Sequence, residues 1–133
     1  MESVPVTIYG GETRPLLLSL WRGARGKCPA CGEGKLFARA LATEPTCSAC
    51  GEELHHHRAD DLPAYLNILV TGHIAVGTVM PIVGLGLMSV WPLTALAIIL
   101  TVAASVLFMR PLKGMVVGAQ WALRMHGFGG DED

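Results

Sequence analysis

Charged residues are scarce in this 133-residue chain, at 16% of the sequence, and one long stretch has none. No Lys, Arg, Asp or Glu lies between Leu62 and Met109, where the only titratable side chains are Tyr65 and His73. A soluble core helix never needs so long an uncharged run, so the composition excludes a water-soluble globular enzyme. Because 51% of the residues are hydrophobic, a disordered tail is excluded as well.

The sequence also lacks the patterns that carry catalysis. It shows no nucleophile with its base, no glycine loop for phosphate and no paired-carboxylate cleft, so we expect no enzymatic activity. No cleavable signal peptide is expected, because the apolar run Leu16–Trp21 has only six residues and follows acidic Glu2 and Glu12. The four cysteines are therefore expected to be reduced thiolates that hold a metal, rather than two disulfides.

The cysteines form two C-x-x-C pairs, Cys28 with Cys31 and Cys47 with Cys50, separated by fifteen residues and each followed by glycine. Such pairs fold into knuckles that aim their sulfurs at one ion, and the glycine permits the left-handed turn after each. The spacing predicts a small zinc ribbon over residues 28–54. Its apolar content is too low for independent folding, and a zinc ion would contribute ~10 to 16 kcal/mol of apparent binding free energy.

Zinc is the first expectation for this site, and iron held as in rubredoxin is the alternative. Four protein sulfurs leave no open coordination position. Metal-assisted hydrolysis is therefore not expected with either ion.

The uncharged stretch, residues 62–109, predicts a membrane α-helical hairpin of two transmembrane helices. Leu62 to about Leu85 and about Trp91 to Met109 each reach the ~20 apolar residues that cross the hydrocarbon layer. Seven Lys and Arg precede the first span, three follow the second and none lies in the turn. The positive-inside rule then places both termini and the ribbon in the cytoplasm of a bacterial inner membrane.

Segments suited to the membrane surface flank these elements. Residues 1–27 join a loose start to the Leu16–Trp21 run and four nearby basic groups, which suits a short helix on anionic lipid headgroups or one packed on the next domain. Residues 110–133 predict a C-terminal amphipathic interfacial helix that ends in an acidic tail. Its polar stripe would contain Arg110, Lys113, Val117, Gln120 and Arg124.

Potential metal ligands gather in residues 55–61, between the ribbon and the hairpin. They are His55, His56, His57, Asp60 and Asp61. Imidazole and carboxylate groups suit Zn, Cu, Fe and Ni, but adjacent side chains do not all point the same way. A solvated hinge is the simpler interpretation, with Asp60 or Asp61 capping the first span, and a second metal site or partner site is the alternative.

His73 is an intramembrane polar residue of a different kind. It would lie ~15 Å beyond Pro63 along a helix, near the bilayer midplane, where an ionisable group is costly and usually faces protein or a polar cavity. We expect a neutral ring. It would either bond Thr101 or a freed backbone carbonyl, or meet a larger partner protein as a ligand or proton relay.

Several motifs resemble one known family. They are Arg22-Gly23, the runs Cys28 to Phe37 and Cys50 to Asp61, Gly72-His73-Ile74, and the segment from Gln120 to Phe128. Together they closely resemble the domain-of-unknown-function 983 family, small inner-membrane proteins found chiefly in alphaproteobacteria. The resemblance covers about residues 15 to 128.

The resemblance implies a fold and a setting but no activity. Genes of this family often lie near those for haem-copper oxidase subunits and assembly factors, which implies a role in assembling or accompanying a terminal oxidase. Here the chain departs from the family in having Gly77 where a proline is common and no acid at the end of the first span. The family's motif positions correspond to Cys28, Cys31, Cys47, Cys50, His55, His56, His57, Arg58, Asp60, Asp61, Gly72, His73, Lys113, Gln120, Trp121, Met125 and His126.

Three functions remain open from the sequence. The first is a non-enzymatic accessory subunit or assembly factor of an integral membrane complex, with respiratory cytochrome c oxidase as the best guess. The second is metal or redox handling, through iron in the four-cysteine site or through copper or haem at the histidines. The third is nucleic-acid binding by the ribbon. It is disfavoured, because residues 26–58 carry four basic and four acidic groups and so lack a positive face.

Overall fold

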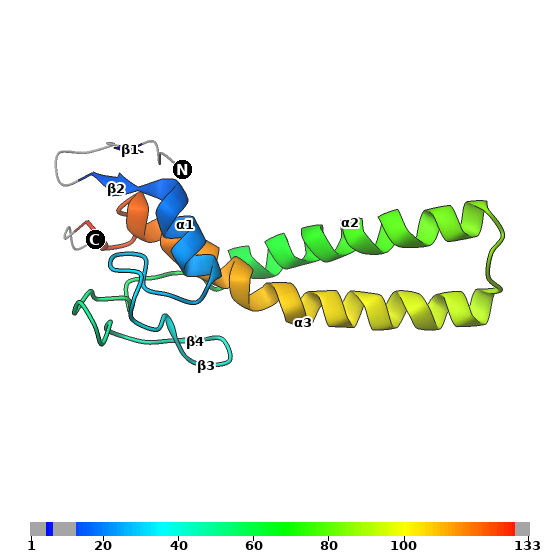
Figure 1. Cartoon of the computed structure of the whole chain (residues 1–133), viewed down its shortest axis with the longest axis horizontal. Coiled ribbons are helices and arrows are strands. Elements are labelled where there is room, and N and C mark those ends of the chain that lie inside the picture. Colours follow the sequence, from blue (N-terminus) through cyan, green and yellow to red (C-terminus); the bar gives the residue numbers. More distant parts are fainter. Residues whose placement is uncertain (1–4, 7–12, 130–133) are drawn as a thin grey trace. The chain divides into compact units, whose positions relative to one another are not determined.

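The computed structural model describes residues 5–6 and 13–129, so the predicted acidic tail from Asp131 lies outside the described residues. The chain forms two compact units (Figure 1). The hairpin unit is Asp61–Met109, and the head unit combines Met1–Asp60 with Arg110–Asp133. Helix α3, Val90–Ala122, contributes residues to both units.

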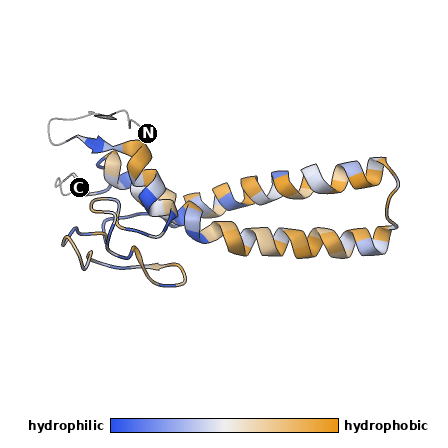
Figure 2. Cartoon of the chain, viewed as in Figure 1, coloured by the Kyte–Doolittle hydropathy of each residue, from blue (hydrophilic) through white to orange (hydrophobic). Residues whose placement is uncertain are grey.

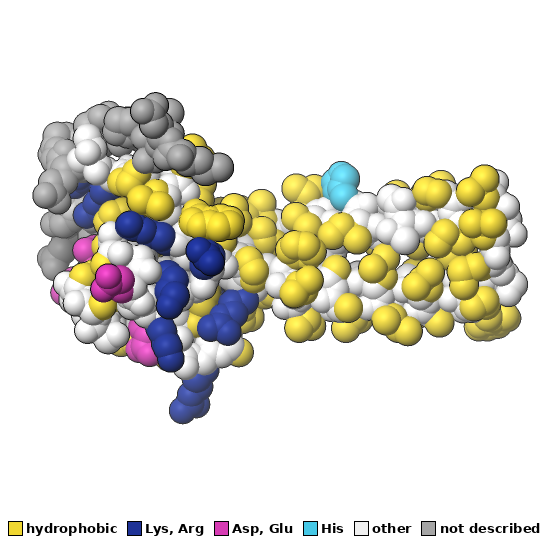
Figure 3. Space-filling model, viewed as in Figure 1, with side chains coloured by type: hydrophobic (Ala, Val, Ile, Leu, Met, Phe, Trp, Pro, Cys, Tyr) yellow, Lys and Arg dark blue, Asp and Glu magenta, His cyan; other side chains and the backbone are white. Residues whose placement is uncertain are grey.

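The hairpin unit holds α2, Leu62–Gly84, and the first part of α3. Each helix is long and apolar enough to span a membrane, as the uncharged stretch predicts. Most of the large apolar side chains on these helices are exposed. Figure 2 colours much of both helices as hydrophobic, and in Figure 3 hydrophobic side chains occupy much of the visible face of the hairpin. Exposing so much apolar surface to water is unfavourable, so lipid or another protein must cover it.

The start of α2 agrees only partly with the sequence. Pro63 stands in the first turn, where its missing N–H costs nothing. Asp61 occupies the N-cap position, but its side chain makes no capping hydrogen bond. Beyond α2, Gly86 adopts a φ of +64° in the turn that leads to α3.

Small and polar side chains meet inside the hairpin. Asn67 and Thr71 are buried on α2 and Ala104 is buried on α3. The Nδ2 group of Asn67 donates a 2.6 Å hydrogen bond to Oγ of Ser105. In an apolar surrounding, such bonds and close contacts hold helices together, because lipid supplies no hydrophobic drive between them.

The head unit contains short strands and one short helix. Strand β1, Pro5–Val6, pairs antiparallel with β2, Arg14–Pro15, and α1 follows as Leu16–Ala24. Strands β3, Phe37–Arg39, and β4, Ala42–Thr43, form the antiparallel hairpin of the ribbon. The buried side chains of the head unit include Leu36, Phe37, Leu54, Val116, Val117, Trp121 and Phe128.

Helix α1 packs on α3 through glycine. A Cβ added to Gly23 would collide with the backbone carbonyl of Gly114, and one added to Gly118 would collide with that of Ser19. Only residues without a side chain permit so close an approach of two backbones. The sequence left two interpretations of the short helix in residues 1–27, a position on lipid headgroups or packing on the next domain. The face of α1 that contains Gly23 packs within the chain, on α3. The opposite face of α1 leaves Leu17 and Trp21 exposed.

The C-terminal segment differs from the prediction of a separate interfacial helix. Residues 110–122 continue α3 without a break, although Pro111 lies inside the helix. Val117 and Gln120, expected on the polar stripe, are buried. The reason is that this stripe is a contact face, where the Gln120 amide pairs with the backbone of Arg58.

The α1–α3 contact leads to a stability prediction. Gly114→Ala would place a methyl group against the Gly23 carbonyl, where backbone meets backbone and neither side can yield by a rotamer change. We expect a loss of about 1 to 3 kcal/mol, the usual cost of overpacking, visible as a lower thermal midpoint in detergent.

The matched control is Gly72→Ala on α2, where nothing lies within 4 Å of the added Cβ. This variant should melt no earlier than wild type, because alanine favours a helix over glycine. Equal thermal midpoints for the two variants would contradict the close contact.

Candidate metal centre

The two cysteine knuckles have the same backbone geometry. Gly32 N donates to Cys28 O at 2.8 Å, and Gly51 N donates to Cys47 O at 3.0 Å. Both glycines are left-handed, with φ of +75° and +77°. The glycine after each pair therefore serves the turn that the sequence predicts, and residues with a Cβ would be strained there.

The four sulfurs come together. Cys28 Sγ lies 3.8 Å from Cys50 Sγ, and Cys31 Sγ lies 3.7 Å from Cys47 Sγ. All four sulfur atoms are within 4.8 Å of one another. In a tetrahedral site with Zn–S bonds of about 2.3 Å, the sulfurs are about 3.8 Å apart, so this arrangement fits one four-coordinate ion.

Backbone amides surround the sulfurs and set their acidity. Glu33 N donates to Cys31 Sγ and Ala49 N to Cys47 Sγ, each at 3.4 Å. The amides of Gly34 and Glu33 lower the pKa of the Cys31 thiol to about 6. Burial instead raises the pKa of Cys28 and of Cys50. A cation among the four sulfurs would offset that desolvation and favour the thiolates that bind it.

Neighbouring residues pack closely on the buried side of the site, at Cys28 and Cys47, whereas Cys50 is exposed. A Cβ on Gly34 would collide with the Cys47 sulfur, so glycine is needed where the first knuckle approaches the second pair. Arg22 Nη1 donates to the carbonyls of Pro29 at 3.2 Å and Ala30 at 2.8 Å. The guanidinium thus ties α1 to the first knuckle.

Three motif positions named by the resemblance join the ribbon and its following segment to α3. The Gln120 side chain accepts from Arg58 N at 2.9 Å and donates to Arg58 O at 3.0 Å. Trp121 Nε1 donates to Glu52 Oε1 at 3.0 Å, directly after the second knuckle. Lys113 Nζ donates to Leu41 O at 2.8 Å.

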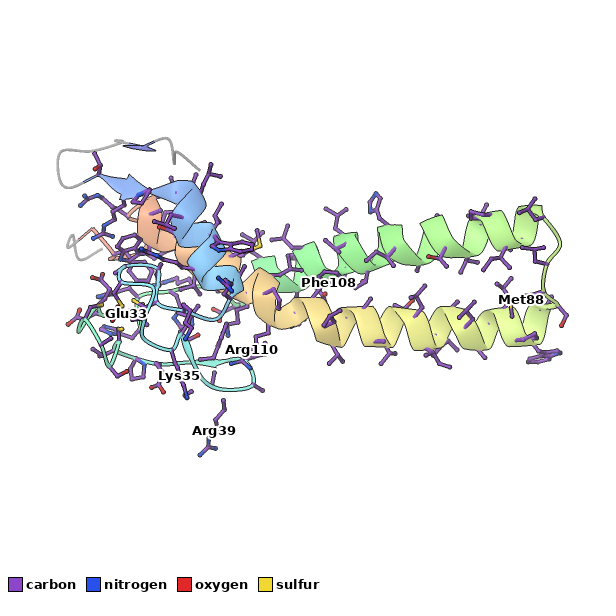
Figure 4. The ribbon with its side chains drawn as sticks, viewed as in Figure 1. Glu33, Lys35, Arg39, Met88, Phe108 and Arg110 are labelled. Atoms are coloured by element: carbon purple, nitrogen blue, oxygen red, sulfur yellow. The ribbon has the colours of Figure 1, made fainter. Side chains whose placement is uncertain are left out.

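An aromatic contact supports the same junction. The Arg110 guanidinium lies over the Phe37 ring at 5.1 Å, and the labelled side chains of Lys35 and Arg39 come from the ribbon (Figure 4). Arg39 itself extends away from the ribbon. The junction is therefore held by polar contacts at several points.

The three histidines after the ribbon separate into different roles. His57 Nδ1 lies 2.9 Å from Leu54 O, and because a carbonyl only accepts, this nitrogen carries the proton. Its Nε2 then accepts from Thr43 Oγ1 at 3.1 Å. Burial lowers the pKa of His57, which keeps the ring neutral. Both its nitrogens serve the local structure.

His55 and His56 gather with Glu53 instead of with Asp60 and Asp61. A ligand atom from each of the three lies within 4.8 Å of the others. Asp60 and Asp61 are exposed and belong to no such group among the described residues. Sequence reasoning missed Glu53. Its position two and three residues before the histidines was the available signal.

His73 is exposed on α2. Its Nδ1 donates a 2.7 Å bond to Leu69 O in the same helix, and Thr101 bonds Ala97 O rather than His73. Leu69 O belongs to the regular part of α2, four residues before His73, so neither the predicted bond to a freed carbonyl nor the one to Thr101 is found among the described residues. Because Nδ1 donates to Leu69 O, Nε2 of the same ring has no partner among the described residues.

Comparison with known proteins gives one match. A family model described as "Protein of unknown function (DUF983)" matches residues 37–121, which include the second cysteine pair, both candidate spans and the Gln120–Trp121 contacts. No curated protein and no solved structure matches the chain.

The different pKa shifts of the cysteine thiols lead to a prediction about their reactivity. While a chelator begins to withdraw the ion from the still folded protein at neutral pH, iodoacetamide should alkylate Cys31 before Cys28, because backbone amides lower the pKa of Cys31 whereas burial raises the pKa of Cys28. Mass spectrometry of the peptides would give the order. Metal-loaded protein, with all four sulfurs bound, is the control and should resist alkylation. Faster labelling of Cys28 would contradict the assignment.

Proposed function

Because this chain belongs to the DUF983 family, for which no activity is described, we propose a function from its chemistry. It is a membrane-anchored, non-enzymatic zinc-ribbon protein that serves as an accessory subunit or assembly factor of a larger membrane-protein complex. The observation that carries this proposal is His73, whose Nε2 has no partner among the described residues and which stands exposed on a largely apolar surface.

The metal centre in this proposal is structural. Four sulfurs fill the coordination of one zinc ion and leave no position for a substrate or an activated water. Zinc suits the role because it has no redox chemistry. Iron in the same four-cysteine site would instead make an electron carrier, and its ferric form would colour the purified protein.

The surface of the hairpin supports a partner beyond lipid. The exposed threonines Thr78, Thr94 and Thr101 satisfy their hydroxyl groups on carbonyls four residues earlier in their own helices. Lipid can cover such positions at little cost. The imidazole differs, because in hydrocarbon its free Nε2 lacks the donor or ion that it would find in water. A facing helix with a donor group would satisfy it.

The proposed partner is a respiratory haem-copper oxidase or its assembly intermediate. The resemblance of the motifs supports this choice, since genes of the family often lie beside those for oxidase subunits. The closed metal centre supports an accessory role over catalysis.

The membrane in this proposal is the bacterial inner membrane, with both termini in the cytoplasm. Seven basic residues before α2 and three after Met109, against none in the turn, favour this orientation. The exposed Leu17 and Trp21 on α1, near Arg22 and Arg25, suit anionic headgroups on that side. Alkaline phosphatase fused to the C-terminus should be inactive in growing cells and green fluorescent protein there should be bright. An active phosphatase fusion would contradict the orientation.

The partner is tested by photo-crosslinking in native membranes. With benzoylphenylalanine at Val76, which is exposed on α2 one turn beyond His73, we expect an adduct with an oxidase subunit or assembly factor, identified by mass spectrometry. The matched control has the probe at Ile98, which is exposed on α3. Adducts at position 76 that contain only lipid or a second copy of this chain would contradict the proposal.

A further inference from the structure

A second group of potential metal ligands lies outside the site of Cys28, Cys31, Cys47 and Cys50, which is called the sulfur cage below. In the part of the chain that the structure describes, it consists of Glu53, His55 and His56, with one ligand atom from each within 4.8 Å of the others. The two imidazole rings lie on the same side of the chain, with centroids 4.1 Å apart. Two imidazoles and a carboxylate are a common donor set for borderline transition-metal ions.

His56 is held in place from several directions. Its Nε2 lies 3.0 Å from Oε2 of Glu53. The ring of Phe128 meets it edge-on at 5.8 Å and 71°. Gly127, left-handed at φ +91°, brings its backbone so close that an added Cβ would lie 2.8 Å from Nδ1 of His56. The turn after α3 is therefore shaped around this ring.

The same group opens into a cavity of about 1110 Å³. His55, His56, Arg58 and His126 line this cavity, together with Gly127 and Phe128. His126 itself has φ +53°, a backbone conformation that costs energy in a residue with a side chain. Backbone strain of this kind is often found at functional sites.

We propose that Glu53, His55 and His56 bind one exchangeable divalent transition-metal ion of the zinc, nickel or copper class, separate from the ion in the sulfur cage. Three protein ligands leave a coordination position open toward the cavity. An ion held in this way is accessible to exchange, whereas four sulfurs enclose theirs.

The geometry requires only small adjustments. Metal bonds of about 2.1 Å put tetrahedral ligand atoms about 3.4 Å apart. The Glu53–His56 pair is already closer than this, at 3.0 Å. The Glu53 side chain is 65% exposed, so it is free to rotate as the ion replaces its hydrogen bond. The open position would take water or an anionic group, since Arg58 lines the cavity beside it.

The test uses the full chain in detergent, purified through a tag without histidine and with the cage already loaded with zinc. Calorimetric titration with Ni²⁺ should show one further site in wild type. His56→Ala and Glu53→Gln should each weaken it at least tenfold. Asp61→Asn, which removes an exposed carboxylate that belongs to neither group of ligands and makes no capping bond, is the matched control and should bind as wild type does.

Zinc analysis of the same samples reports whether the cage survives each substitution. Glu53→Gln is nearly isosteric, so it decides the outcome if His56→Ala also releases the caged zinc. No Ni²⁺ binding to wild type would overturn the proposal. Equal binding by wild type and Glu53→Gln would also overturn it.

Discussion

Convergence of four sulfurs on one point is the constraint on which the head unit depends. The ribbon strands are only three and two residues long, too short to hold a fold by their ladder alone. Each knuckle closes on itself, with Cys28 N bonded to Gly34 O and Cys47 N to Glu52 O. Those bonds do not join one knuckle to the other. The sulfurs do, and an ion between them would turn two small loops into one folded unit.

Order in the ribbon extends from the cage into the C-terminal part of α3. Glu52 belongs to the second knuckle and accepts from the Trp121 indole. Arg14 adds to this contact, with its guanidinium 4.4 Å from the centre of the Trp121 ring and Nη1 donating to Trp121 O at 2.8 Å. The polar groups of the junction are paired, as burial requires. Loss of the metal would therefore disturb the head unit well beyond the ribbon.

Local patterns in the sequence predicted much of this structure. The C-x-x-C-G repeats specified the knuckles and their left-handed glycines, because both follow from chain geometry over five residues. The uncharged stretch predicted two helices long enough to cross a membrane, because the length and the mean hydropathy of a segment depend only on its own residues.

What depends on contacts between distant residues could not be predicted. Gln120 looked like one member of a polar stripe, and only its pairing with Arg58, 62 residues away, makes it part of a buried face. Gly114 and Gly118 carried no sign that α1 would cross them. Glu53 had a local signal that was overlooked, but the turn of Gly127 and Phe128 against His56 comes from the far end of the chain and could not be predicted.

The central claim is that the four cysteines hold one metal ion. X-ray absorption at the metal edge tests it most directly, on protein purified from membranes and washed with a mild chelator to remove exchangeable ions. We expect a shell of four sulfurs at about 2.3 Å from one zinc ion per chain. A chain without metal, or a shell with nitrogen or oxygen in place of sulfur, would contradict it.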